Sequence, residues 1–208
     1  MRDLRKIQGY YFITDSGLSR MGNEHDVREA YRAGTTIFQY RNKTSSTRLM
    51  IEEAKKLRSL CPSAIFLIND RVDIALAVGA DGVHLGNDDM PYRDARRLLG
   101  DDAIIGITAH SVAESVAAEK NGADYVGVSP IFSTSTKPDA GKPAGVRLVS
   151  EVKSAVKIPV VAIGGINLSN AQSVVEAGAD AVCAISAVVC STDVAGEVGK
   201  FQKLFANR

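Results

Sequence analysis

Three polar residues at alternate positions, Gln39, Arg41 and Lys43, carry the clearest chemical signal in the sequence. They lie in TIFQYRNK, residues 36–43, whose β-branched and aromatic residues are typical of a strand. Side chains alternate between the two faces of a strand, so the amide, the guanidinium and the ammonium group share one face. Because unpaired buried charge is costly, this face predicts an anionic ligand. The alternative is an edge strand whose polar face is solvated.

Two aspartates that follow later strand-like stretches are candidate metal ligands. Asp70 ends the stretch IFLIND, and Asp89 lies in the stretch GNDDMP. Magnesium binds oxygen ligands, often one or two carboxylates together with phosphate oxygens and water. Two aspartates on neighbouring strand ends therefore predict a Mg²⁺ cofactor beside the cations of the first stretch. Two alternatives stay open: Asp70 is a helix N-cap, and Asp88 replaces Asp89 as a ligand or both are turn residues.

A long loop, SPIFSTSTKPDAGKP, spans residues 129–143. Loops of about 12–15 residues without secondary structure are usually functional or disordered. The hydroxyls of Thr134 and Thr136 and the ammonium group of Lys137 are candidate ligand contacts. At the active end of the molecule this loop predicts a lid, and a flexible surface loop is the alternative.

Two short turns near the end of the chain predict a phosphate site. Gly164-Gly165 and Ile185-Ser186 follow the last two expected strands, where backbone N–H groups and a helix N-terminus commonly bind phosphate. His84 and His110 are the acid–base candidates, although we favour a hydrogen-bonded structural role for both. Two anion sites without an obvious nucleophile between them favour an enzyme that joins a diphosphate substrate to a phosphorylated acceptor, with pyrophosphate leaving.

Eight strand-like runs alternate with helix-period segments and must position these side chains. The strands are expected at 10–14, 36–41, 64–69, 82–85, 103–108, 125–128, 160–163 and 181–185, with helices such as 49–60, 111–121, 146–156 and 171–177. This order predicts an α/β fold, a single (β/α)8 TIM barrel domain over residues 1–208, with a doubly wound open sheet as the alternative. The junctions AGTTIF, VGADGV, NGADYV and AGADAV precede every second strand and indicate a barrel built from repeated units.

The composition excludes several classes of protein. A net charge of +1 gives no basic field for nucleic acid or an anionic membrane. No run approaches the roughly 20 apolar residues that span a bilayer, and the first residues lack a signal-peptide pattern. The three cysteines, Cys61, Cys183 and Cys190, have no metal-ligand spacing and are expected as small buried residues in a reducing compartment. We therefore expect a cytoplasmic protein that binds small phosphorylated molecules, with a homodimer as one option.

A series of motifs in the chain matches a known family. The chain resembles the thiamine-phosphate synthases, also called thiamine-phosphate pyrophosphorylases, over essentially its whole length. The matching stretches are YFITD (11–15), QYRNK (39–43), IND (68–70), DGVHLGNDDMP (81–91), GITAHS (106–111), STSTK (133–137), IGGI (163–166) and AIS (184–186). The resemblance implies that the ring nitrogen of hydroxyethylthiazole phosphate attacks the methylene carbon of aminomethyl-hydroxypyrimidine diphosphate, with loss of pyrophosphate through a pyrimidine carbocation.

The resemblance also implies roles for single residues. The pyrimidine diphosphate would contact Gln39, Arg41, Lys43, Asn69, Thr108 and Lys137, with Arg41, Lys43 and Lys137 as the catalytic candidates. Asp70 and Asp89 would bind Mg²⁺. The thiazole phosphate would contact Thr134, Thr136, Gly165, Ile185 and Ser186.

Three departures from the family pattern qualify these roles. Thr108 stands where Ser is frequent, Asn42 stands where an acidic residue often precedes the lysine, and GNDD replaces the usual GQED. The alternatives to a synthase are a thiazole tautomerase and a non-catalytic regulatory barrel that binds a phosphorylated ligand. Retention of Arg41, Lys43, Asp70 and Asp89 argues against the tautomerase, and the intact pair of anion sites argues against the regulatory barrel.

Overall fold

A computed structural model describes residues 3–134, 136 and 141–206 of the chain. Eight parallel strands form a closed barrel in chain order. The barrel closes between the first and last strands, where Gly9 pairs with Ala181 and Tyr10 with Val182. The predicted TIM barrel is therefore confirmed, and both the open sheet and an edge position for the second strand are excluded. The strands are β1 (Gly9–Ile13), β2 (Ile37–Tyr40), β3 (Ile65–Asn69), β4 (Gly82–Leu85), β5 (Ile104–Ala109), β6 (Tyr125–Val128), β7 (Val160–Ile163) and β8 (Ala181–Cys183).

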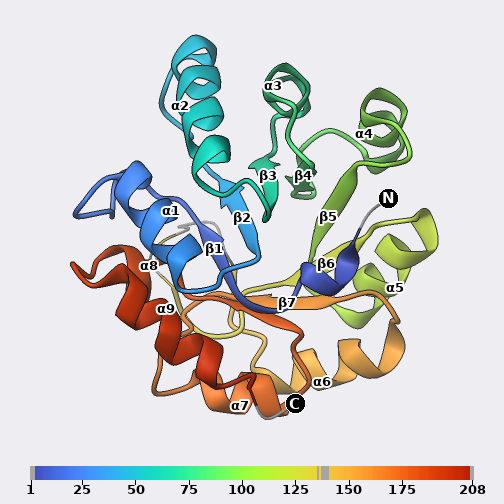
Figure 1. Cartoon of the computed structure of the whole chain (residues 1–208). Coiled ribbons are helices and arrows are strands. Elements are labelled where there is room, and N and C mark those ends of the chain that lie inside the picture. The colour runs from blue at the N-terminus through green and yellow to red at the C-terminus, as the bar shows by residue number, and fades with distance from the viewer. Residues whose placement is uncertain (1–2, 135, 137–140, 207–208) are drawn as a thin grey trace.

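The α-helices lie outside the ring of strands, as Figure 1 shows. They begin and end at the expected signals: Ser46 and Ser111 accept N-cap hydrogen bonds from Leu49 N and Glu114 N, and Gly79 ends one helix in the left-handed conformation. Among the described residues, no helix is both long and apolar enough to cross a membrane. The helices are η1 (Leu4–Lys6), α1 (Asn23–Arg32), α2 (Thr47–Leu60), α3 (Val72–Val78), α4 (Tyr92–Leu99), α5 (Val112–Asn121), α6 (Val146–Ala155), α7 (Ala171–Glu176), α8 (Ile185–Val189) and α9 (Val194–Lys203).

Alternation along the strands divides the apolar residues between two cores. One set packs between the strands and the helices, and includes Phe12 and Phe38. The other set fills the barrel interior, with Tyr11 and Tyr125 among its largest members, and Leu4 and Ile7 join it from the segment before β1. Because that segment covers the amino-terminal end of the strands, any open space in the barrel interior must lie towards the carboxyl-terminal end.

The repeated helix-to-strand junctions have a common hydrogen-bond pattern. An aspartate stands before each of β4, β6 and β8, and one of its oxygens accepts from the first residues of the previous strand at 2.7–2.8 Å. The same carboxylate pairs with a cation on the helix before that previous strand. The pairs are Arg58–Asp81, Arg96–Asp124 and Lys153–Asp180, at 3.2, 2.7 and 2.7 Å. The first junction has threonines instead, and Thr36 Oγ1 donates to Lys6 O of η1 at 2.7 Å.

Two predicted boundaries differ from the structure in a way that affects the site. The second strand ends at Tyr40, so Arg41 lies in the following loop rather than on the strand. The last strand ends at Cys183, because Ile185 begins α8 instead of continuing the sheet. All three cysteines are free thiols, and Cys61 and Cys183 are buried as expected while Cys190 is partly exposed.

Candidate active site

A cavity of about 260 Å³ lies among the carboxyl-terminal ends of the strands and the loops that follow them. Every predicted site residue that the structure describes lines this cavity. Lys137 lies outside the described residues. The predicted residues in the lining are Gln39, Arg41, Lys43, Asn69, Asp70, Asp89, Thr108, Thr134, Thr136, Gly165, Ile185 and Ser186. Residues that lie up to 147 positions apart in the chain, from Gln39 to Ser186, therefore share one cavity.

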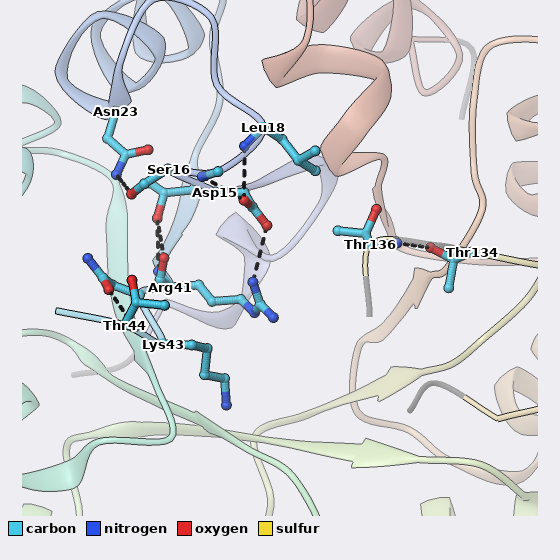
Figure 2. Close-up of polar contacts among 12 residues, drawn as sticks. Asp15, Ser16, Leu18, Asn23, Arg41, Lys43, Thr44, Thr134 and Thr136 are labelled. Atoms are coloured by element: carbon cyan, nitrogen blue, oxygen red, sulfur yellow. Dashed lines mark hydrogen bonds and ion pairs between the residues drawn. The ribbon is translucent and has the colours of Figure 1, made fainter. Parts of the chain in front are cut away.

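The two cations after β2 contact carboxylates of the chain itself. Arg41 Nη1 lies 3.1 Å from Asp15 Oδ2, and Lys43 Nζ contacts Asp70 Oδ2. Figure 2 shows the Arg41 guanidinium turned towards Asp15, with the Lys43 side chain extending beside it. The Arg41 backbone is fixed as well, since its N–H donates to Thr14 Oγ1 at 2.9 Å. The premise that these cations are buried was wrong for Lys43, which is exposed, and Arg41 is only partly buried. The predicted anionic ligand stays a prediction, and a diphosphate would have to compete with these two carboxylates.

Asp70 and Asp89 form a carboxylate pair beside Lys43. Asp70 has a left-handed backbone (φ 62°) and its N–H donates to His84 O at 2.8 Å. It is not a helix N-cap, because Arg71 occupies that position before α3, and this alternative was wrong. Asp89 Oδ2 accepts from Gly86 N at 2.7 Å. Burial, and next the neighbouring Asp70 carboxyl, raises the pKa of Asp89, which indicates that the two acids approach each other.

This pair fits a divalent cation with oxygen ligands. Within the part of the chain that the structure describes, no group of three or more His, Cys, Asp or Glu side chains could hold a metal. Asp70 and Asp89 would therefore supply only some of the ligands, as is usual for Mg²⁺, which keeps water and substrate oxygens in its shell. Asp88 also lines the cavity but is exposed, and the Gly86 hydrogen bond orients Asp89 rather than Asp88.

Two adjacent glycines line the opposite side of the cavity, where β7 ends. Gly164 and Gly165 have positive φ values of 105° and 63°, and a side chain at Gly165 would overlap the Ser133 carbonyl. These glycines therefore allow the segment after β6 to pack closely on the end of β7. Within that segment, Thr134 Oγ1 accepts from Thr136 N at 3.2 Å (Figure 2). Ser186, in the first turn of α8, lines the same side.

A chain of buried hydrogen bonds crosses the cavity floor, and the sequence analysis did not find it. Gln39 Nε2 donates to Tyr11 Oη, which lies 2.8 Å from Tyr125 Oη. Tyr125 Oη lies 2.9 Å from His84 Nδ1, and His84 Nε2 lies 2.9 Å from Thr108 Oγ1. Burial raises the pKa of both tyrosines, so both phenols stay protonated. The preferred structural role of His84 is supported, although its ring also lines the cavity.

Two glycines inside strands could have indicated this network. A side chain at Gly106 would overlap the Tyr125 ring, and one at Gly127 would approach His84 Cε1 to 2.9 Å. Glycine inside a strand often marks a close approach by another group. His110, by contrast, is exposed and absent from the described lining; its Nδ1 lies 2.6 Å from Ser129 O.

Comparison with known proteins identifies the family. A family model described as thiamine monophosphate synthase matches residues 10–188. The chain belongs to this family. It is 56% identical to a thiamine-phosphate synthase of Methanosarcina barkeri over 92% of this chain and 88% of that protein. It is 50% identical to one of Chloroflexus aurantiacus over 93% and 91% of the two chains. A thiamine phosphate pyrophosphorylase structure from Pyrococcus furiosus superposes with a TM-score of 0.91, at 42% identity and coverages of 99% and 98%.

Membership of the thiamine monophosphate synthase family makes the protein a transferase. The three departures from the family motifs leave the cavity intact. Thr108 keeps its hydroxyl in the lining, and Asp89 of the GNDD stretch faces Asp70. Asn42 lies outside the lining and folds its own loop, because its Oδ1 accepts from Thr44 N and Ser45 N.

Proposed function

We propose that the protein is a Mg²⁺-dependent thiamine-phosphate synthase that releases pyrophosphate. It joins 4-amino-2-methyl-5-(diphosphooxymethyl)pyrimidine to hydroxyethylthiazole phosphate and gives thiamine monophosphate. The observation that carries the proposal is that one cavity holds two cations and a carboxylate pair on one side and a glycine-rich backbone cradle on the other. A diphosphate with its metal suits the first side, and a monophosphate suits the second.

The chain's own residues would bind and orient the two substrates. Gln39 lies at the cavity floor, where its amide oxygen can accept from the pyrimidine. Arg41 and Lys43 would exchange Asp15 and Asp70 for diphosphate oxygens when the substrate binds. This exchange releases Asp70 for the metal, so binding of the diphosphate and of the metal should strengthen each other.

The reaction breaks the bond between the methylene carbon and the diphosphate oxygen, and forms a bond from that carbon to the thiazole nitrogen. Negative charge grows on the leaving diphosphate. Arg41 and Lys43 stabilise this charge at fixed positions, which requires no covalent nucleophile. Asp70 and Asp89 would hold Mg²⁺, which when bound would supply further charge stabilisation as a Lewis acid.

The test is pyrophosphate release by the purified protein, with each substrate alone and both together, with and without Mg²⁺. We expect release only with both substrates and the metal. Asp70→Ala should abolish this release and leave binding of the thiazole phosphate unchanged, since Asp70 lies on the other side of the cavity. Release without metal, or wild-type turnover in Asp70→Ala, would refute the metal assignment.

A thiazole tautomerase is less consistent with the cavity. It would work without the diphosphate and metal apparatus and would need an acid–base group at the ligand. His110 does not lie in the described lining, and His84, which does, has both ring nitrogens within hydrogen-bond distance of protein groups, Tyr125 Oη and Thr108 Oγ1. Thiazole phosphate that binds but gives no pyrophosphate in the assay above would favour the tautomerase or a regulatory barrel.

A further inference from the structure

In the hydrogen-bonded series on the cavity floor, the donor and the acceptor of each bond can be assigned by counting the protons that the side chains carry. Gln39 Nε2 can only donate, so Tyr11 Oη is an acceptor at 2.8 Å. Each tyrosine hydroxyl then has one proton to donate. In the first arrangement Tyr11 donates to Tyr125, Tyr125 donates to His84 Nδ1, and His84 Nε2 donates to Thr108 Oγ1. In the second arrangement these three bonds run the opposite way.

The second arrangement leaves a buried proton without an acceptor. Tyr11 Oη would accept from both Gln39 and Tyr125, and its own proton would have nowhere to go among the described residues. Tyr11 is only 1% exposed, so its hydroxyl has little contact with solvent even though the residue contributes to the cavity lining. An unmade hydrogen bond at a buried donor costs about 1–3 kcal/mol. The first arrangement avoids this cost, because both tyrosine protons and the His84 ring proton then have acceptors, and the hydroxyl proton that remains available belongs to Thr108.

A hydroxyl proton of Thr108 that is not donated to His84 could be donated to an anion in the cavity. Thr108 is partly exposed and lines the same cavity as the two cations and the carboxylate pair. A hydroxyl that already accepts from His84 presents its own proton to the cavity. A hydroxyl that donates to His84 presents only lone pairs, which repel an anion. Whether Thr108 accepts from His84 or donates to it therefore decides whether the Thr108 hydroxyl favours or opposes a bound diphosphate.

We propose that His84 is a positioning residue: as the neutral tautomer with its proton on Nε2, it turns the Thr108 hydroxyl proton towards an anionic ligand in the cavity. The ligand class is a diphosphate or pyrophosphate, and this assignment rests on the proposed function. Two glycines in the strands make room for the His84 ring and its neighbour: Gly106 leaves space for Tyr125, and Gly127 leaves space for His84. The His84 and Tyr125 rings also stack, with centroids 5.5 Å apart.

The first test reads the tautomer directly. The chain has three histidines, and comparison of ¹⁵N spectra of wild type and His84→Asn assigns the His84 ring signals. We expect the neutral Nε2–H tautomer at neutral pH. The Nδ1–H tautomer would overturn the proposal. This measurement needs no substrate, so it decides the tautomer even if the protein lacks synthase activity.

The second test asks whether His84 acts through Thr108. The probe is Mg²⁺-pyrophosphate, with its affinity measured by calorimetry. We expect His84→Asn, whose amide oxygen can still accept from Tyr125 but which cannot reach Thr108, to weaken binding about 10- to 100-fold, like Thr108→Val. The double variant should bind no more weakly than Thr108→Val alone. His84→Gln, whose amide N–H can replace Nε2–H, should recover most of the affinity.

Two results would contradict the coupling. Losses that multiply in the double variant would mean that the two residues act independently. Equal weakening by His84→Gln and His84→Asn, with unfolding temperatures like that of the wild type, would mean that the donor to Thr108 is irrelevant.

Discussion

At the scale of single residues, the site holds its charges in pairs that a ligand can rearrange. Arg41 and Lys43 contact Asp15 and Asp70, and Asp70 also faces Asp89. A substrate diphosphate with a metal would satisfy the same charges in a different pairing. Such pairs give each of the two cations a carboxylate partner while leaving these groups available to a ligand, and two predictions follow at this scale.

Lys43→Ala should slow the chemical step more than it weakens pyrimidine binding. We expect kcat to fall about 100-fold with a smaller change in KM, because the ammonium group acts mainly on charge that grows during the reaction. Steady-state kinetics of pyrophosphate release measures both values. Lys56→Ala is the matched control, since this exposed lysine lies outside the cavity lining and its ion pair among the described residues is with Glu24 at 3.7 Å. A change confined to KM in Lys43→Ala would contradict the prediction.

Asp89→Asn should stabilise the protein while removing its response to Mg²⁺. The pKa of Asp89 is raised by burial and by Asp70, so the folded state binds this proton more tightly than the unfolded state. Stability from this group is therefore present below its unfolded pKa and is lost as pH rises through the folded pKa. At neutral pH we expect Tm of Asp89→Asn to exceed that of wild type by roughly 2 °C. The difference in Tm should vanish as the pH is lowered towards the ordinary pKa of an aspartate carboxyl.

Thermal unfolding with and without Mg²⁺ completes this test. Metal should raise Tm of the wild type and of the surface control Asp101→Asn, but not of Asp89→Asn. An Asp89→Asn protein that is less stable than wild type at neutral pH, or that gains as much from Mg²⁺, would remove Asp89 from the metal site.

At the scale of elements, glycines in the strands set the shape of the cavity floor. Gly106 of β5 lies beside Tyr125 of β6, and its missing side chain provides the space for the aromatic ring. The two tyrosines of the floor come from β1 and β6, which approach only through the barrel interior. The spacing of large and small residues on different strands therefore positions the site.

Gly106→Ala should displace the Tyr125 ring and break the floor network. We expect a loss of about 1–3 kcal/mol of unfolding free energy, the usual cost of overpacking a core, together with weaker pyrophosphate binding. Gly199→Ala is the control, because this glycine lies in α9 and an added methyl group would have no atom of the described residues within 4 Å apart from its chain neighbours and nearby helix backbone. Alanine should therefore stabilise the helix by about 0.5–1 kcal/mol. Urea denaturation gives both values, and an unchanged Gly106→Ala protein would contradict the packing argument.

At the scale of the whole molecule, the three aspartate junctions connect the barrel to its outer helices. Each links one strand start, the strand before it and the helix before that strand. Their burial differs. In the Arg96–Asp124 pair the side chains are 15% and 6% exposed, against 36% and 29% in Lys153–Asp180. The buried pair should therefore contribute most to holding the barrel closed.

Arg96→Ala should cost about 3–5 kcal/mol of unfolding free energy, because it removes the cation that pairs with the buried Asp124 carboxylate. Lys153→Ala, at the equivalent but more exposed junction, should cost about 1 kcal/mol or less. Urea denaturation of both variants compares the junctions directly. Similar losses in the two proteins would show that burial does not set their importance.

Local sequence patterns were sufficient to predict the barrel and most of the site. Strand and helix periodicity is local, and side chains after parallel strands must meet at one end, so Gln39, Asp70 and Gly165 could be brought together without coordinates. The repeated Gly-Ala-Asp junctions before β4, β6 and β8 carried the same information about repetition.

The partners of those residues, by contrast, follow from the closed barrel. Tyr11 and Tyr125 lie 114 positions apart and touch because their strands face each other across the barrel interior, a relation that no local pattern encodes. The ends of β2 and β8, and the pairing of Arg41 with Asp15, depend on how loops pack after the sheet has closed. Periodicity fixes which side of its own element a residue occupies, whereas contacts across the barrel depend on the closed geometry of all eight strands.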